Sequence, residues 1–404
     1  MRASQVLQKC LRSSLPGMHA LRRRALLQAV EALIQGRRLT LSDIARSWPG
    51  ALRMRAPLKA FDRLLGNRHL HGERHGIELD MARWLLRGPQ PVILIDWSDL
   101  KPDKSWCLLR AAIPVGGRTL TLLDMVFPGR EQGSPGAEKR FLQQLSKLVP
   151  AHSTPILVTD AGFRSPWFRA VSALGWHCVG RLRGTTCIKP QHVPDHPQQW
   201  ADSRHLHAMA TATPHELPSM LINRSAPLAC RLVVYAKARK GRRKVNRRTP
   251  IKASRSSESL KAAAREREPW LIVASPELSN ASPRQLVKLY ARRMQIELAF
   301  RDLKSHRYGQ ALEDSLTRQG GRLQILLLVS TLAGFVSWLA GMACEAADIA
   351  HWLWPVKSTR KLYSTLRIGR EALARGWPLG PASRCLEHLR SPPQAVLEQM
   401  CLRP

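Results

Sequence analysis

Acidic residues are scarce in this sequence. Only 29 of the 404 residues are Asp or Glu, against 64 Lys and Arg, which gives a formal net charge of +35. The corresponding pI is about 11.2, above the value of roughly 9 that is typical of nucleic-acid-binding domains. The imbalance favours a nucleic-acid partner, which a ribosomal or chromatin-binding protein would also have.

Paired cysteines and a secretory signal are also lacking. The eight cysteines include no CxxC pair, which argues against a zinc ribbon. Their scatter through a long chain is typical of reduced, buried thiols in a cytosolic protein. The N-terminal segment MRASQVLQKCLRSSLPG is basic but has no apolar stretch of the kind that a secretory signal needs. We therefore expect a cytoplasmic protein.

Long apolar runs are absent with one exception, residues 323–344, which carry no charge. This length is enough to cross a bilayer, and a membrane protein is one hypothesis. A helix buried in a large domain is the alternative. No second span exists. Four polar residues also dilute the run: Gln324, Ser330, Thr331 and Ser337. The pattern favours the buried helix and no membrane.

Residues 1–88 have the pattern of short helices. We expect helices over 20–36, from about Thr40 to Pro49, from Pro57 to Gly66, and over 74–88. Three short helices with tight turns and many cations are typical of a helix-turn-helix DNA reader, although many small bundles share the pattern. The prediction is an all-helical N-terminal DNA-binding domain over 1–88.

After residue 88 the pattern becomes that of strands mixed with helices. We expect a strand at PVILIDWSDL, a hairpin around Gly116-Gly117, a helix over 137–148, a strand at TPILVTDAGF, and then a helix and another strand. A further strand, PWLIVASPEL, comes before the last helices. This order predicts an α/β core with a mixed sheet, in residues 89–184 and 268–350.

Between these two parts, residues 185–267 contain loops, a strand candidate at 230–238 and a basic run without acids. Its cations are Lys237, Arg239, Lys240, Arg242, Arg243, Lys244, Arg247, Arg248, Lys252 and Arg255. A solvated loop is one interpretation. An arm that follows DNA phosphates is the one we favour, because cations at this density repel one another unless anions neutralise them.

One helix is predicted from Ser282 to Lys304. Ser282, Pro283 and Gln285 match a helix start with a capping box. At 100° per residue, one stripe carries Tyr290, Arg293, Glu297, Arg301 and Lys304, and an apolar flank carries Leu289, Ile296, Phe300 and Leu303. A salt-bridged surface helix would explain these charges by itself.

That interpretation leaves two aspartates unexplained. Asp96 ends the apolar run VILID and Asp160 ends ILVTD, so each is expected at the end of an apolar strand. A carboxylate in such a place is costly to desolvate unless it binds a cation or stays at an exposed edge. Together with Glu297 these acids make an all-oxygen set suited to Mg²⁺ or Mn²⁺.

The order and spacing of these residues resemble a known family. Asp96 in IDWSD, Asp160 in VTDAGF, and the series Tyr290-x2-Arg293-x3-Glu297-x6-Lys304 match the pattern of the IS-four family of bacterial insertion-sequence transposases. The segments DRLLGNRHLH, LKS and STLRIGREAL are similar to that family as well, so the resemblance runs along most of the chain.

The resemblance implies a ribonuclease-H-like α/β catalytic core, a β-rich insertion over 185–267 and a C-terminal helical region over 351–404, where dimer contacts could lie. It implies that Asp96, Asp160 and Glu297 are catalytic and hold two Mg²⁺ ions, with Mn²⁺ as a substitute. Tyr290, Arg293 and Lys304, joined by Arg301, would hold DNA phosphates.

The partners implied by the resemblance are double-stranded DNA, as transposon inverted-repeat ends and as target, and further copies of this chain in a homodimer or higher synaptic complex. The reaction would be cut-and-paste transposition, with a DNA hairpin formed during cleavage and the freed 3′ ends joined to target DNA. The implied location is the bacterial cytoplasm, in association with the nucleoid.

Several residues near the predicted site keep alternative interpretations. Asp99 could replace Asp96 as a ligand, Asp124 is predicted to be structural or to support a ligand, and Asp302 lies about 140° round the helix from Glu297. Packing and base stacking are both open for three aromatic residues: Trp97, Phe163 and Trp167. The pair His177 and Cys178 lacks further ligands in spacing, which favours a place in the core.

Two other classes of function remain as hypotheses. A nuclease on the same fold, such as a junction resolvase, needs similar acids but no recognition of a DNA end. A DNA-binding regulator needs no acids at all, and carboxylates close to phosphate weaken binding unless metal intervenes.

Overall fold

The chain folds into two compact units. A computed structural model describes residues 2–193, 199–238, 268–358 and 360–402, together with positions 256, 257, 259, 260, 263 and 264. The first unit contains the chain up to Pro155 and from Arg292 onward, and the second contains Ile156–Ala291. Both contain helices and strands, so the predicted mixed α/β class is confirmed.

The first unit begins with helices and continues into three strands. The helices are α1 (Ala3–Cys10), α2 (Ala20–Gly36), α3 (Leu41–Arg46), α4 (Arg55–Leu65) and α5 (Arg68–Leu85). The strands are β1 (Val92–Asp99), β2 (Trp106–Pro114) and β3 (Thr119–Pro128), followed by η1 (Gly129–Glu131) and α6 (Pro135–Ser146). The strands lie antiparallel in the order β3-β2-β1.

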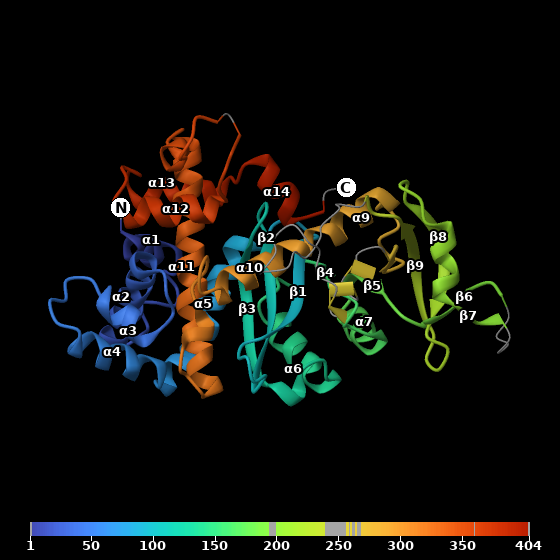
Figure 1. Cartoon of the computed structure of the whole chain (residues 1–404), viewed down its shortest axis with the longest axis horizontal. Coiled ribbons are helices and arrows are strands. Elements are labelled where there is room, and N and C mark those ends of the chain that lie inside the picture. The colour runs from blue at the N-terminus through green and yellow to red at the C-terminus, as the bar shows by residue number, and fades with distance from the viewer. Residues whose placement is uncertain are drawn as a thin grey trace. The chain divides into compact units, whose positions relative to one another are not determined.

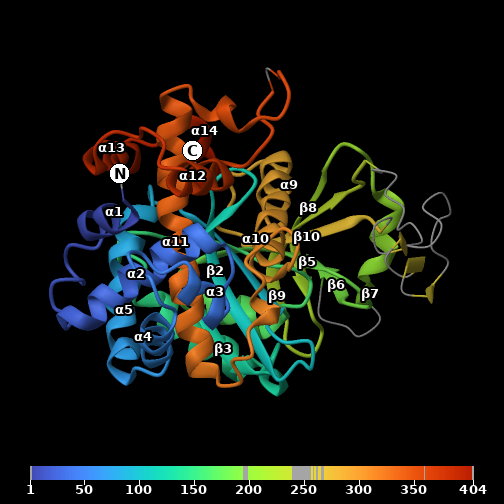
Figure 2. The same ribbon diagram turned by 60° about the vertical axis from the view of Figure 1, so that its left-hand side comes forward.

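The C-terminal part of the chain completes this unit. It contains α10 (Met294–Lys304), η4 (Leu312–Asp314), α11 (Gly320–Ala346), η5 (Ala350–Leu353), α12 (Thr365–Ala374), α13 (Ala382–Arg390) and α14 (Gln394–Met400). Helix α11 contacts α2, α4 and α12, and also strand β3. Figures 1 and 2 show α11 running among the N-terminal helices and the C-terminal ones.

Helix α11 accounts for the long apolar run. It is long and apolar enough to cross a membrane, but 83% of its most apolar 18-residue window is buried inside the protein. Gln324, one of the polar residues in the run, donates from its side chain to the carbonyl of Asp124 and accepts from the amide of Val126. The structure therefore supports the interpretation of this helix as core.

The described residues of the second unit form a sheet of seven strands. Its elements are β4 (Ile156–Val158), α7 (Ser165–Ser172), β5 (His177–Leu182), β6 (Cys187–Pro190), β7 (Ala201–Asp202), η3 (Ser203–Met209), β8 (His215–Ile222), β9 (Leu228–Tyr235) and β10 (Trp270–Ala274), and α9 (Pro283–Arg292) follows. The strand order is β4-β5-β10-β9-β8-β6-β7. Strands β4 and β5 are parallel and the other pairs antiparallel, so the sheet is mixed, as predicted.

Most element predictions agree with the structure, including the helix over 20–36 and the hairpin at Gly116-Gly117. Both glycines have positive φ, 88° and 77°, a backbone state that other residues rarely adopt. Helix α1 was not predicted, and α5 begins at Arg68 rather than near position 74, because Asn67 caps it by accepting from the amide of Leu70.

Of the basic run predicted to follow DNA phosphates, only Lys237 lies among the described residues, and its other members lie outside them. The Lys237 ammonium lies 4.8 Å from the centroid of the Trp270 ring. That distance is within the range of a cation–π contact.

Candidate active site

Asp96 lies within a strand rather than at its end. The prediction that it ends its strand is wrong, because β1 continues for three more residues and Asp96 is paired with Arg110 of β2. The apolar run stops at Asp96, but the hydrogen-bonded ladder does not depend on side-chain polarity and runs on to Asp99. Asp96 accepts a hydrogen bond from the amide of Trp97, and its side chain is 12% exposed.

A buried ion pair supports this strand from the same face. Arg110 lies opposite Asp96 on one side and opposite Asp124 of β3 on the other, so the three side chains share one face of the sheet. Arg110 makes two hydrogen bonds of 2.7 Å to the carboxylate of Asp124, and Phe300 of α10 lies against its guanidinium. This geometry gives Asp124 a structural role.

The predicted single helix over 283–304 is wrong. Helix α9 ends at Arg292 and α10 begins at Met294, with Arg293 between them. The amide of Ile296 donates to the carbonyl of Arg293, only three residues back, so the regular four-residue ladder is interrupted there. Tyr290 and Glu297 therefore belong to different helices, and the prediction that they lie on one stripe of a single helix is wrong.

Helix α10 and strand β1 form a hollow of about 470 Å³. The lining residues are Asp96, Trp97, Ser98, Glu297, Phe300, Arg301, Lys304, Ser305 and Glu313. Four of the predicted site residues thus line one hollow. Glu313 of η4 is an exposed third acid in this lining that sequence reasoning missed, because nothing in the LED segment distinguishes it from a surface turn.

Arg293 joins the two carboxylates of this hollow. Its guanidinium lies 3.4 Å from a carboxylate oxygen of Asp96 and 2.5 Å from one of Glu297. Asp96 and Glu297 are 201 positions apart in the chain, so only the fold brings them to one cation. The Glu297 side chain is 41% exposed, which leaves it open to solvent and to substrate.

Lys304 lies at the other end of α10. Its ammonium donates to the backbone carbonyl of Asp99 at 3.2 Å. Asp99 itself does not line the hollow, because three positions along a strand turn its side chain to the face opposite that of Asp96. Of these two aspartates, the geometry favours Asp96 as the ligand.

Asp160 and Tyr290 belong to the second unit. Asp160 follows β4 by two residues, is partly exposed, and accepts a hydrogen bond of 2.7 Å from the amide of Gly162. Tyr290 is 4% exposed. Its ring meets that of Trp270 edge-on at 4.9 Å, and its hydroxyl is hydrogen-bonded to Arg181.

The aromatic residues beside the acids are packed. Phe163 and Trp167 are 3% and 1% exposed, with ring centroids 4.7 Å apart. Trp97 lies 5.5 Å from Phe127, measured between ring centroids. Cys178 is buried as well, and burial raises the pKa of its thiol to about 12. These contacts favour packing over base stacking for Phe163 and Trp167, and a core position for Cys178.

The donor chemistry of the hollow fits a divalent metal. The two carboxylates, of which that of Glu297 is well exposed, offer the hard oxygen ligands that Mg²⁺ and Mn²⁺ prefer. The guanidinium of Arg293 already bridges them. Within the described part of the first unit, no three His, Cys, Asp or Glu side chains form a cluster able to hold an ion. Asp96 and Glu297 are therefore only part of a set of metal ligands.

Removing Arg293 is expected to strengthen metal binding in the absence of DNA. In Arg293→Gln, Asp96 and Glu297 lose the cation that neutralises them, so a divalent ion no longer competes with a guanidinium. We expect the Kd for Mn²⁺, followed by quenching of tryptophan fluorescence, to fall about tenfold, which is roughly 1.4 kcal/mol. Lys288→Gln removes an equal charge outside the hollow and should leave the Kd unchanged. Equal Kd values for Arg293→Gln and the wild type would show that the ion pairs do not oppose metal.

Residues 87–333, more than half of the chain, match the model of a protein family described as Transposase DDE domain. No curated protein matches the chain at a significant level. The matched range includes β1, α10 and the hollow between them, as well as Asp160 and Tyr290.

Proposed function

The chain belongs to the family of transposases with a DDE domain, and on this premise we propose that it binds the inverted-repeat ends of a transposable element and moves them by cut-and-paste transposition. It is a metal-dependent nuclease and strand transferase whose substrate is DNA. We propose further that it belongs to the IS-four group, close to the transposase of a tetracycline-resistance composite transposon.

The catalytic acids of this proposal are Asp96, Asp160 and Glu297. The observation that carries it is the meeting of Asp96 and Glu297 at one guanidinium in an open hollow. Asp160 is the third member by the family pattern, and its partly exposed place after β4 leaves its carboxylate accessible. Two Mg²⁺ ions, with Mn²⁺ as a substitute, would activate a water or a 3′-hydroxyl and stabilise the leaving oxygen of an in-line attack on phosphorus.

Arg293, which precedes α10, and the cations of α10 would then act on the phosphate. Arg293 can turn from the carboxylates to a phosphate and bind it with two hydrogen bonds, while Lys304 supplies a point charge. Arg301 lines the same hollow and adds a third cation. Tyr290 is proposed with them, but since it is 4% exposed, contact with DNA requires its hydroxyl to leave Arg181.

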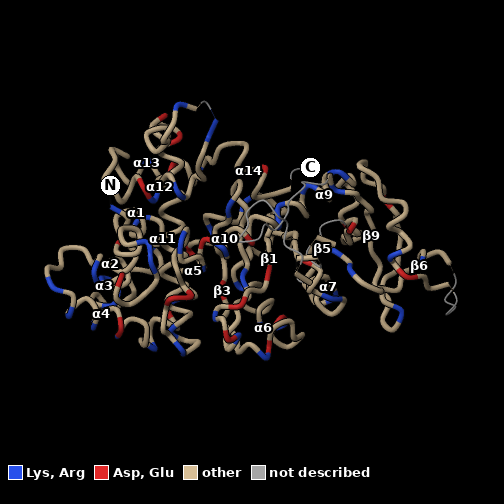
Figure 3. Tube along the Cα trace, viewed as in Figure 1, with Lys and Arg blue, Asp and Glu red and all other residues tan. Residues whose placement is uncertain are grey.

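We propose that the N-terminal helices recognise DNA and that α4 is their reading helix. Its inner side carries Pro57, Phe61, Leu64 and Leu65, which are buried. Arg55, Lys59 and Arg63 are exposed and four residues apart, so they form one basic stripe along the helix. Figure 3 shows Lys and Arg repeated along these helices.

Replacing Lys59 with Gln is expected to weaken DNA binding with little effect on folding, because the side chain is exposed. One lost phosphate contact lowers the salt dependence of log K by about 0.9. The measurement is fluorescence anisotropy of a labelled end duplex at several salt concentrations. Lys147→Gln, on the surface outside this domain, is the matched control. An unchanged salt dependence would remove α4 from the interface.

The remaining features of the proposal concern assembly and location. Two DNA ends must be joined, so we propose a homodimer or larger synaptic complex, with contacts in the region 351–404. Size-exclusion chromatography with light scattering, on the chain alone and with end duplex, tests the assembly, and a monomer in both states would contradict it.

We place the protein in the bacterial cytoplasm at the nucleoid and not in a membrane. Cell fractionation tests the location, and recovery of the protein in the membrane pellet would contradict it.

The test of the function uses a labelled duplex that carries an inverted-repeat end from the DNA flanking the gene. The purified chain should cut at the repeat boundary with Mg²⁺ and not with a chelator. Cutting without preference for the end would favour a nuclease such as a junction resolvase. Binding without cutting, in the presence of Mg²⁺, would favour a DNA-binding regulator.

A further inference from the structure

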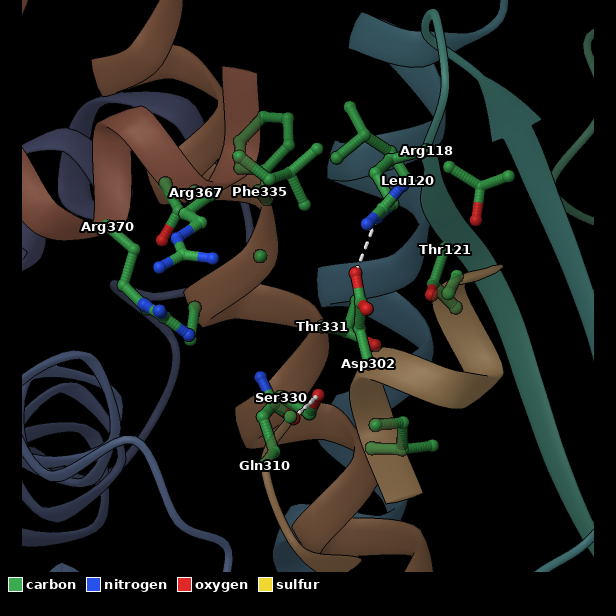
Figure 4. A pocket seen from close by; sticks show the side chains of 18 of the residues that line it. Arg118, Leu120, Thr121, Asp302, Gln310, Ser330, Thr331, Phe335, Arg367 and Arg370 are labelled. Carbon is green, nitrogen blue, oxygen red and sulfur yellow. Dashed lines mark hydrogen bonds and ion pairs between the residues drawn. The ribbon is translucent and has the colours of Figure 1, made fainter. Parts of the chain in front are cut away.

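A second hollow lies in the first unit, on another side of α10. Its volume is about 300 Å³, and it is lined by α2, β2, β3, α10, α11 and α12. Six of its lining residues are arginines: Arg37, Arg110, Arg118, Arg301, Arg367 and Arg370. Figure 4 shows Arg367 and Arg370 on one side of this arginine pocket, with Arg118 and Asp302 on the other. The acids of the proposed active site do not line it.

Positive charge in the arginine pocket exceeds negative charge. Asp302, which pairs with Arg118, is the only acid among the residues that line it. Arg110 is held by Asp124, and Arg37 and Arg370 share Glu371. Six arginines thus have three carboxylates between them. Within the described part of the chain, neither Arg301 nor Arg367 has a carboxylate partner.

The crowding of these cations has an electrostatic cost. Burial lowers the pKa of Arg370, and the neighbouring charge of Arg37 lowers it further. The Nε of Arg370 is buried and has no hydrogen-bond partner among the described residues. A bound anion would relieve both the repulsion and the unmet donor, whereas a water molecule would accept from the donor but leave the positive charges unneutralised.

Close packing of α11 against α12 sets the position of the positive charge that α12 brings to the arginine pocket. Gly341 of α11 and Gly369 of α12 face each other, and a Cβ on either would overlap a backbone carbonyl of the other helix. This contact brings the first turn of α12 to the arginine pocket, with Ser364 and Arg367 in its lining. The first turn of a helix carries partial positive charge, which adds to that of the arginines.

We propose that the arginine pocket binds a phosphate of the DNA backbone next to the one being cut. Arg301 lines both this pocket and the hollow of Asp96 and Glu297, so the two can bind neighbouring phosphates of one DNA strand. The hydroxyls of Thr121 and Thr331 supply donors beside those of the guanidinium groups, whereas the Ser330 hydroxyl already donates to Gln310. The inference rests on the proposed DNA transposase function and adds a second phosphate site to it.

The test measures binding rather than cleavage, so its result does not depend on whether the enzyme cuts. Arg367→Gln removes an exposed guanidinium that makes no ion pair in the described chain, and thermal unfolding checks that the variant is folded. Its affinity for end duplex, without divalent metal, is measured by anisotropy over a range of salt concentrations. Arg384→Gln removes an equal charge from α13 outside the pocket, and Arg367→Lys keeps the charge.

We expect Arg367→Gln to lower the salt dependence of log K by about 0.9, as the loss of one phosphate contact requires. Arg384→Gln and Arg367→Lys should keep the wild-type slope. A slope in Arg367→Gln equal to that of the wild type would overturn the proposal for DNA. If inorganic phosphate then raises the Tm of the wild type but not of Arg367→Gln, the pocket binds a free phosphate ligand instead of DNA.

Discussion

Glu297→Gln should lower metal-dependent cleavage of an end duplex by about 10³-fold while the variant still binds the duplex. The substitution keeps the size of the side chain and removes a charged metal ligand. A bound metal contributes several kcal/mol of transition-state stabilisation, and about 4 kcal/mol corresponds to that loss of rate. Single-turnover cleavage measures the rate, and anisotropy measures binding.

Two further variants make this result specific. Glu387→Gln makes the same change on α13, away from the hollow, and should cut at the wild-type rate. Glu313→Gln changes the third acid of the hollow, and its cleavage rate shows whether Glu313 also acts as a metal ligand. Cleavage by Glu297→Gln within about tenfold of the wild type would contradict its assignment as a ligand, since a lost metal ligand costs more than that.

Asp124→Asn should destabilise the first unit by about 3–5 kcal/mol, because it leaves Arg110 as a buried charge without a counter-ion. Both side chains of this pair are 5% exposed, and Asp124 supplies both acceptors of the Arg110 guanidinium. We expect the Tm to fall by roughly 10 °C, measured by thermal unfolding followed by circular dichroism.

Two controls separate burial from charge. Glu131→Gln breaks a surface ion pair with Arg140, whose side chains are 30% and 53% exposed, and should change stability by less than about 1 kcal/mol. The double variant Arg110→Met with Asp124→Leu removes both charges and should recover most of the loss, because no unpaired charge remains. If Asp124→Asn lowers the free energy of unfolding no more than Glu131→Gln does, water must reach the pair of Arg110 and Asp124.

Local chemistry determined much of this protein from its sequence. Helix α2 has the predicted bounds, Thr40 caps α3, and Gly116-Gly117 form the hairpin turn, because each feature depends on residues close in the chain. The excess of cations and the spacing from Tyr290 to Lys304 likewise pointed to a transposase, and the family match confirms that class.

Contacts between distant segments were decided by the tertiary structure alone. Periodicity predicted one helix over 283–304, but the helix is interrupted at Arg293. The side chain of Arg293 reaches the carboxylate of Asp96 on β1. Apolar runs suggested a strand end at Asp96, whereas pairing with β2 carries the strand on to Asp99. Arg37 and Arg367 share a pocket although 330 positions separate them. Sequence spacing reports neighbours along a helix or strand, while a site made of several elements exists only once their burial against one another fixes which side chains meet.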